Sequence, residues 1–293
     1  MTYVEIAIDG VGFRARLLEE RAPGATAALR AALSFAGHAV HGQWDGDLFR
    51  TVESIALPVP PRESGVGFQH PGLVVLDPAS GQLAICYGQG RLNEHTIPLT
   101  PIPVAEIGGD LAPLAEAGRS LQWTGTRPFT MAVSADQEAP LAPPPSPVGR
   151  TIEVALGDTL TTATLLEETS PQTTAAFARL LPLSGRATNT ISSGPLTRFW
   201  NANGGPEGET PLDDVSDDPG QVILYPGYLY YLPARPWRGI RIAREATMMR
   251  GPAGGGGPHL VPLARFDGDW SAFADAAERL MQDGAQPMSI RLR

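Results

Sequence analysis

The amino-acid sequence predicts a mainly β protein made of two similar domains in tandem, each a small closed barrel with short helices. Short stretches of alternating polarity recur between turn residues, as is typical of β-strands. The second half of the chain repeats the first, and a Pro-rich stretch separates the two halves. A closed barrel suits such a list of elements, because closure leaves no exposed edge strand.

The chain begins with a predicted hairpin and helix. Residues 3–8 and 11–17 alternate apolar and polar side chains on either side of Asp9-Gly10, and Asp-Gly in this setting predicts a two-residue turn. Pro23 opens a run of strong helix formers that reaches residue 33, which predicts a short amphipathic helix. Further strands are expected at 36–44 and 49–57.

The rest of the first half predicts five more elements. Residues 71–77 and 82–87 are expected to form a second hairpin around the turn residues between them. A Pro-broken edge strand is expected at 98–107. Residues 109–118 predict a short helix that a glycine ends, and 122–133 a final strand.

The second half repeats this order of residues. Leu17–Pro23 reappears 148 positions later as Leu165–Pro171, and at the same offset Pro71–Leu76 matches Pro219–Leu224. Near the C-terminus the offset becomes 159, which predicts a net insertion of 11 residues, expected around 250–258. The sequence therefore indicates an internal duplication. The predicted domains are 1–135 and 150–293, with a semi-rigid Pro-rich linker at 136–149.

Composition excludes several classes of function. The net charge of -9 argues against nucleic acid as a partner. Every basic residue is arginine, which excludes a lysine Schiff base, a pyridoxal-phosphate lysine and a P-loop lysine. With one cysteine the chain forms no internal disulfide and no cysteine-based zinc cluster. No cofactor motif is present, so a small molecule is the expected partner, and homo-oligomer formation is left open.

The sequence predicts neither a signal peptide nor a membrane span. The N-terminus has no basic and apolar leader pattern, and no apolar run approaches the roughly 18 residues that a membrane helix needs. A cytoplasmic protein is the simplest interpretation.

The heptapeptide from His41 to Asp47 is the candidate site. His41 suits a general acid or base, because an unperturbed imidazole titrates near neutrality. Asp45 and Asp47 share a face if the strand continues, and one of them could orient the imidazole or bind a cationic group. Trp44 is a candidate wall for stacking a substrate. Each has a structural alternative: a strand histidine bonded to a carbonyl, two turn carboxylates and a core indole.

A second group of candidates follows the second predicted hairpin. Tyr87, Arg91, Glu94 and His95 could line the mouth of the barrel and bind substrate, although a solvated loop is the favoured interpretation of each. His38 and His41 form an H-x-x-H pair, but no third ligand lies nearby, so no metal site is predicted.

The residues also resemble a known family. The pattern resembles a group of largely uncharacterised bacterial proteins with a cyclophilin-like barrel, and it is similar to the catalytic domain of cucumopine synthase. The matching positions are Ala22, Pro23, Thr26, His41, Trp44, Gly46, Asp47, Pro71, Gly72, Tyr87 and Gly88. The resemblance implies two cyclophilin-like barrels.

The resemblance also implies a reaction. It suggests a condensation of amine and carbonyl with ring closure, of Pictet–Spengler type, in which an aspartate stabilises the iminium and His41 removes the final proton. Isomerase and lyase chemistry need similar groups. A non-catalytic ligand-binding protein is the main alternative. Peptidyl-prolyl isomerisation comes last, because the arginine-bearing segment of true cyclophilins is not recognisable.

The second copy lacks the candidate cluster. At the offset of 148, Asn189, Ser192, Ser193 and Pro195 stand where the first copy has His41, Trp44, Asp45 and Asp47. A purely structural role would predict that both copies keep these side chains. The sequence therefore predicts one barrel that carries the site and a second, degenerate one.

Overall fold

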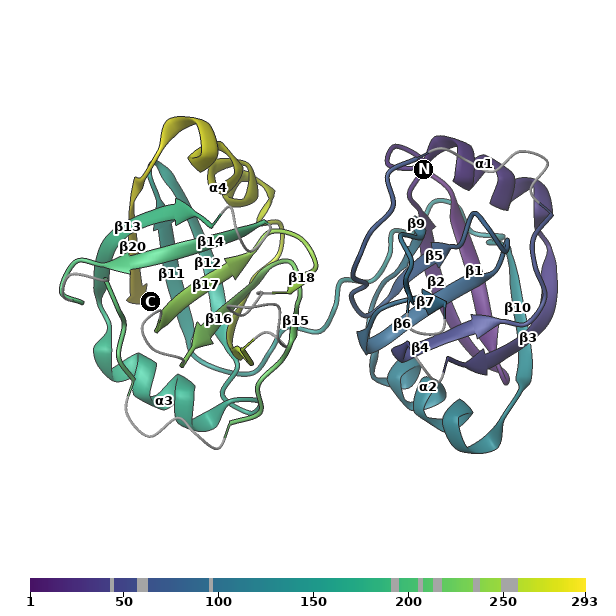
Figure 1. Cartoon of the computed structure of the whole chain (residues 1–293), viewed down its shortest axis with the longest axis horizontal. Helices are drawn as coiled ribbons and strands as arrows, with labels where there is room; N and C mark the ends of the chain where they lie inside the picture. Colours follow the sequence, from purple (N-terminus) through teal and green to yellow (C-terminus); the bar gives the residue numbers. More distant parts are fainter. Residues whose placement is uncertain are drawn as a thin grey trace. The chain divides into compact units, whose positions relative to one another are not determined.

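The fold comes from a computed structural model. It describes residues 1–42, 45–56, 63–94, 97–190, 195–204, 208–212, 218–233, 238–248 and 258–293. The chain divides into two compact units, Met1–Pro145 and Ser146–Arg293, and each holds one closed barrel (Figure 1). Among the described residues, no helix has the length and apolar character to cross a membrane.

The first unit is a closed antiparallel barrel with the strand order β1-β10-β3-β4-β6-β5-β9-β2. Its strands are β1 (Tyr3–Ile8), β2 (Val11–Leu17), β3 (Phe35–His41), β4 (Gly46–Thr51), β5 (Leu73–Leu76), β6 (Leu83–Gly90), β9 (Ile102–Ile107) and β10 (Arg127–Val133). A small ribbon pairs β7 (Asn93–Glu94) with β8 (Ile97–Pro98). Helices α1 (Pro23–Ala32) and α2 (Ala112–Thr124) lie at opposite ends of the barrel (Figure 1).

The wall of this barrel is apolar on both faces. Alternate strand residues such as Ile6, Phe49 and Ile85 fill the interior, as the period of two in a strand requires. Their neighbours Leu48 and Cys86 belong to a second buried cluster on the outer face. The two clusters therefore show which side chains of β4 and β6 face the barrel interior and which face outward.

The second unit repeats the architecture. It contains β11 (Thr151–Leu156), β12 (Thr159–Leu165), β13 (Leu183–Asn189), β14 (Leu196–Asn201), β16 (Tyr228–Leu232), β17 (Gly239–Ala243), β19 (Val261–Phe266) and β20 (Gln286–Leu292). The strand order is β11-β12-β19-β16-β17-β14-β13-β20. This is the same arrangement as β1-β2-β9-β5-β6-β4-β3-β10 in the first barrel, which is its order listed in the other direction around the ring. Helices α3 (Pro171–Leu180) and α4 (Ser271–Asp283) accompany it, as does a ribbon of β15 (Ile223–Leu224) and β18 (Thr247–Met248). The predicted pair of closed barrels is confirmed.

Several predicted elements of the first barrel need correction. The strand expected at 122–133 starts only at Arg127, and the one expected at 49–57 is β4, which ends at Thr51. Residues 102–107 are not an edge strand, because β9 pairs with β2 on one side and β5 on the other. Pro103 is accommodated at a bulge in the β5 pairing, where a missing amide hydrogen costs little. The predicted helix at 109–118 continues to Thr124, and Gly125 follows its end.

The strand register also corrects the predicted repeat. Val74 pairs with Ala105 and Leu229 with Ala264, and a bulge follows at each place. These pairings make Pro226-Gly227, and not Pro219-Gly220, the counterpart of Pro71-Gly72. The offset has thus already grown from 148 to 155 before β16. Most of the insertion therefore precedes residue 226, and of the stretch 250–258, where it was expected, only Pro258 is among the described residues.

The start of the Pro-rich segment is held against the first barrel. Arg14 donates hydrogen bonds to the carbonyl oxygens of Asp136 and Ala139, at 2.6 and 2.7 Å. The Gln137 side chain donates to the carbonyl oxygen of Tyr3 at 2.9 Å. Residues 136–139 therefore belong to the first unit in their contacts, although no helix or strand forms between 134 and 150.

Candidate functional site

His41 and Tyr87 meet inside one end of the first barrel. His41 is the last residue of β3 and Tyr87 lies on β6, the strands on either side of β4. Both side chains point inward, since each is two positions from a core residue, Ala39 and Ile85. Their Nε2 and Oη atoms are 2.6 Å apart, which is hydrogen-bonding distance.

Asp47 occupies the strand between them. Two positions further along β4 is Phe49, whose ring stacks on Tyr87 with a centroid distance of 6.3 Å. The Oδ2 atom of Asp47 accepts a hydrogen bond from the Gln89 amide at 2.7 Å, which leaves lone pairs on the carboxylate for a further donor. The site thus combines an imidazole, a phenol and a carboxylate.

Helix α2 covers this end of the barrel through Gly118. A Cβ atom at position 118 would lie 2.2 Å from Cδ1 of Tyr87, so only glycine lets the helix approach the ring this closely. The sequence suggested that Gly118 ends the helix. The structure gives it a packing role instead, because the ring of Tyr87 lies directly against the helix backbone.

Burial sets the protonation of the pair. Burial holds the pKa of His41 below its ordinary value, and the charges of Asp47 and then Asp45 only partly oppose it. Burial, helped by Asp47 and opposed by Arg119, raises the pKa of Tyr87 to about 12. At neutral pH the site therefore holds a neutral imidazole, which can accept a proton, beside a neutral phenol, which can donate one.

Asp45 has a different environment from Asp47. It is 2% exposed and forms a bidentate ion pair with Arg50, at 2.6 and 2.7 Å. It also accepts the Asn93 amide hydrogen at 2.8 Å. The expected continuous strand is absent, because β4 starts only at Gly46, whose φ of +70° turns the chain. Asp45 thus anchors the 91–93 segment to β4.

The remaining predicted site residues lie apart from His41, Asp47 and Tyr87 or are not among the described residues. The guanidinium of Arg91 stacks 4.8 Å from the centroid of the Phe68 ring, and Glu94 lies on β7. Trp44 and His95 are outside the described residues. His38 points away from His41 and pairs with Glu53 at 2.7 Å. Within the described ranges no group of three His, Cys, Asp or Glu side chains could hold a metal ion.

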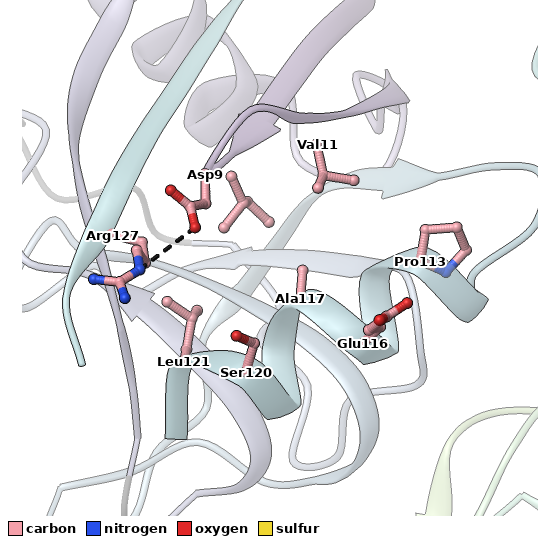
Figure 2. A pocket seen from close by; sticks show the side chains of 9 residues that line it. Asp9, Val11, Pro113, Glu116, Ala117, Ser120, Leu121 and Arg127 are labelled. Carbon is pink, nitrogen blue, oxygen red and sulfur yellow. Dashed lines mark ion pairs between the residues drawn. The ribbon is translucent and has the colours of Figure 1, made fainter. Parts of the chain in front are cut away.

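A cavity of about 230 Å³ lies on the other flank of α2 (Figure 2). An ion pair between Asp9 and Arg127, 3.4 Å long, stands at its edge. It is lined by Ile8, Asp9, Val11, Pro113, Glu116, Ala117, Ser120, Leu121 and Arg127. None of the predicted site residues lines it. Sequence reasoning missed it because its residues come from three separate segments without a shared motif.

The second barrel shows what the same positions hold without the site. By strand register, Asn189 replaces His41 and Thr197 replaces Phe49. Pairing of Cys86 with Leu48 and of Ala243 with Leu196 makes Arg244 the counterpart of Tyr87 and Pro195 that of Asp47. At the offset of 159 Ala277 replaces Gly118. Ring and glycine are lost together, as their packing requires.

Comparison with known proteins places the first barrel. Residues 4–133 match the model of a family described as "Protein of unknown function (DUF3830)". The match covers the strands and helices of the first barrel and none of the second. The match confirms the predicted likeness to a family of uncharacterised proteins, for the first copy of the duplication. No curated protein matches the chain significantly.

Two solved structures resemble part of the chain. One is "Structure of McbB in complex with tryptophan", with a TM-score of 0.39 and 23% identity over 49% of this chain and 48% of that one. The match thus spans about half the length of McbB. The other is the solution structure of the hypothetical protein AF2241 from Archaeoglobus fulgidus, with a TM-score of 0.35 and 14% identity over 45% of this chain and 95% of that one.

Proposed function

We propose that the first barrel, residues 1–135, is an enzyme that moves protons on a small molecule at the His41–Tyr87 pair. The observation that carries the proposal is the 2.6 Å contact between imidazole and phenol beside the carboxylate of Asp47. The second barrel keeps the fold but has asparagine, arginine and proline at the three positions. We therefore assign it, residues 150–293, no catalytic role.

Each group has a distinct part in this proposal. His41 is the base: its neutral ring accepts a proton from a C–H or N–H group of the substrate. Asp47 stabilises the resulting imidazolium, because its charge favours the protonated ring. Tyr87 donates a hydrogen bond, or its proton, to an oxygen on which negative charge develops.

These roles suit a condensation of an amine with a carbonyl compound followed by ring closure. Loss of water from the first adduct needs a proton donor at the oxygen, and the end of cyclisation needs a base at carbon. Tyr87 and His41 supply the two, and Asp47 can stabilise an iminium cation. Isomerases and lyases that move a proton next to a carbonyl use the same pair of groups, so the test spans all three reactions.

The test compares wild type with His41→Ala and Tyr87→Phe on a library of amines and 2-oxo acids, alone and in pairs. Consumption is followed by NMR, and ligand-induced melting shifts are recorded in parallel. We expect either substitution to lower turnover by about 10²- to 10⁴-fold, the usual contribution of a positioned acid or base. Asn189→Ala, at the equivalent position of the second barrel, is the matched control and should leave turnover unchanged.

Two outcomes would reject the proposal. Unchanged turnover in His41→Ala, with its melting temperature intact, would show that the imidazole is not the base. Ligands that raise the melting temperature but are never consumed would identify a binding protein, in which the carboxylate and the aromatic side chains hold a ligand without turnover.

A further inference from the structure

Among the described residues Arg119 has no counter-ion, and it lies on α2 beside the residue that contacts the proposed site. It follows Gly118 on α2, and Gly118 is the residue that packs on the Tyr87 ring. The Arg119 side chain is exposed, and it makes no hydrogen bond or ion pair with any part of the chain that the structure describes. Its guanidinium is therefore available to a ligand.

The helix period places Arg119 on the side of α2 away from the cavity in Figure 2. Leu114, Gly118 and Leu121 face the barrel interior, and Ala117 lines the cavity on one flank. At about 100° per residue, positions 117 and 119 lie on opposite flanks of Gly118. Arg119 thus belongs to the flank that does not face the Asp9–Arg127 ion pair.

The charge of Arg119 reaches the reacting groups. It favours the ionised form of the Tyr87 phenol and so lowers its pKa, against the effects of burial and of Asp47. The site accordingly has an anionic group on β4 and a cationic group on α2. An uncharged ligand would use neither.

The second barrel again provides a comparison. At the offset of 159, Glu278 occupies the position of Arg119, so the charge is reversed in the copy that also lacks His41 and Tyr87. If the charge at this position served only solubility, it would not need to differ in sign between the copy with the site and the copy without it. Arginine is also the side chain whose planar fork best matches a carboxylate.

We propose that Arg119 binds the carboxylate of the substrate and selects small organic acids for the His41–Tyr87 site. This inference rests on the proposed function for the location of the site. It adds a residue of specificity and a substrate class, which is carboxylate-bearing molecules in preference to their neutral amides or esters.

The test uses full-length protein and matched probes. Acetate, pyruvate, L-alanine and L-phenylalanine are each titrated beside the corresponding neutral amide, and the shifts of the His41 ring protons are followed by NMR. In wild type we expect the acids to bind more tightly than the amides. Arg119→Gln should weaken the acids about tenfold to a hundredfold, the range for a charge-assisted hydrogen bond, and leave the amides unchanged. Arg119→Lys should restore part of the loss.

Arg127→Gln is the matched control, since it removes an arginine of β10 that lines the cavity on the opposite flank of α2. Equal binding of acids and amides, equal losses in Arg119→Gln and Arg127→Gln, or no binding of any probe to wild type would each overturn the inference. Acid binding that depends on Arg119, without any turnover that depends on His41, would support the carboxylate site while rejecting the proposed catalysis.

Discussion

Substitution of Gly118 by alanine tests whether α2 and Tyr87 are packed as the site requires. The added Cβ would lie 2.2 Å from one carbon of the Tyr87 ring and 2.5 Å from two others. Carbon atoms in contact are about 3.5 to 4.0 Å apart, so the helix or the ring must move by more than 1 Å. Tyr87 is 5% exposed, which leaves its ring little room to yield.

Two opposing effects set the magnitude. Replacing glycine by alanine inside a helix gains about 1 kcal/mol of helix propensity. Overpacking a core typically costs about 1 to 3 kcal/mol, and a clash this close belongs at the upper end. We therefore expect Gly118→Ala to lower the local stability of the first barrel by roughly 1 to 2 kcal/mol and to separate Tyr87 from His41.

Amide hydrogen exchange followed by mass spectrometry measures this effect in the full-length chain, because peptides from β6 report on the first barrel alone. We expect exchange in residues 83–90 to accelerate about 5- to 30-fold. Ala277→Gly, the reverse change at the equivalent position of the second barrel, should leave these peptides unchanged. Adding Tyr87→Leu should remove the penalty of Gly118→Ala. Unchanged or slower exchange in Gly118→Ala would refute the packing argument.

Three further predictions concern ionisable groups of the first barrel. Asp45→Asn should lower the free energy of unfolding by about 3 kcal/mol, because it leaves the largely buried Arg50 without its anion. Thermal melting measures this loss beside the exposed control Glu138→Gln. Equal changes in melting temperature for the two variants would contradict a structural role of Asp45. An NMR titration of His41 should have its midpoint below pH 6.5, and the midpoint should be lower still in Asp47→Asn, since that carboxylate favours the imidazolium. A higher midpoint in the variant would show that Asp47 does not stabilise the protonated ring. Folding raises the pKa of Tyr87 from 10 to about 12, so the free energy of unfolding should fall as the pH rises through this window. Denaturation measured across the window should show a weaker fall for Tyr87→Phe than for wild type. Equal dependence on pH in the two proteins would contradict the raised pKa.

Local signals in the sequence predicted most of the fold. Asp9-Gly10 between alternating strands gave the hairpin turn, and Ile8 and Val11 do pair across it. Pro23 marks the start of α1. The repeat predicted two barrels because it compares whole patterns over half the chain. The comparison of the two halves matched Pro219-Gly220 wrongly to Pro71-Gly72. Pro-Gly pairs occur in several turns, and only strand pairing shows which pair precedes the equivalent strand.

The candidate site was predicted in part. The heptapeptide contains His41 and Asp47, which do lie together, and Tyr87 was on the list of residues that could line the barrel mouth. The sequence could not separate Asp45 from Asp47, because that depends on the turn at Gly46 and on Arg50 as a partner. It also gave no reason to connect Gly118 or Arg119 with the site, because they come from a helix about 30 residues beyond Tyr87.

The sequence by itself determined the strand and helix content, the duplication and the fact that only one copy keeps an ionisable cluster. These properties follow from side-chain periodicity, turn residues and comparison of the two halves, all of which are local or internal to the chain. The tertiary structure decided which members of the cluster meet. Strand pairing brings β3, β4 and β6 together, and the packing of α2 on the barrel puts Gly118 against the Tyr87 ring. Burial at that junction keeps imidazole and phenol neutral, and no linear pattern encodes how deeply a side chain is buried.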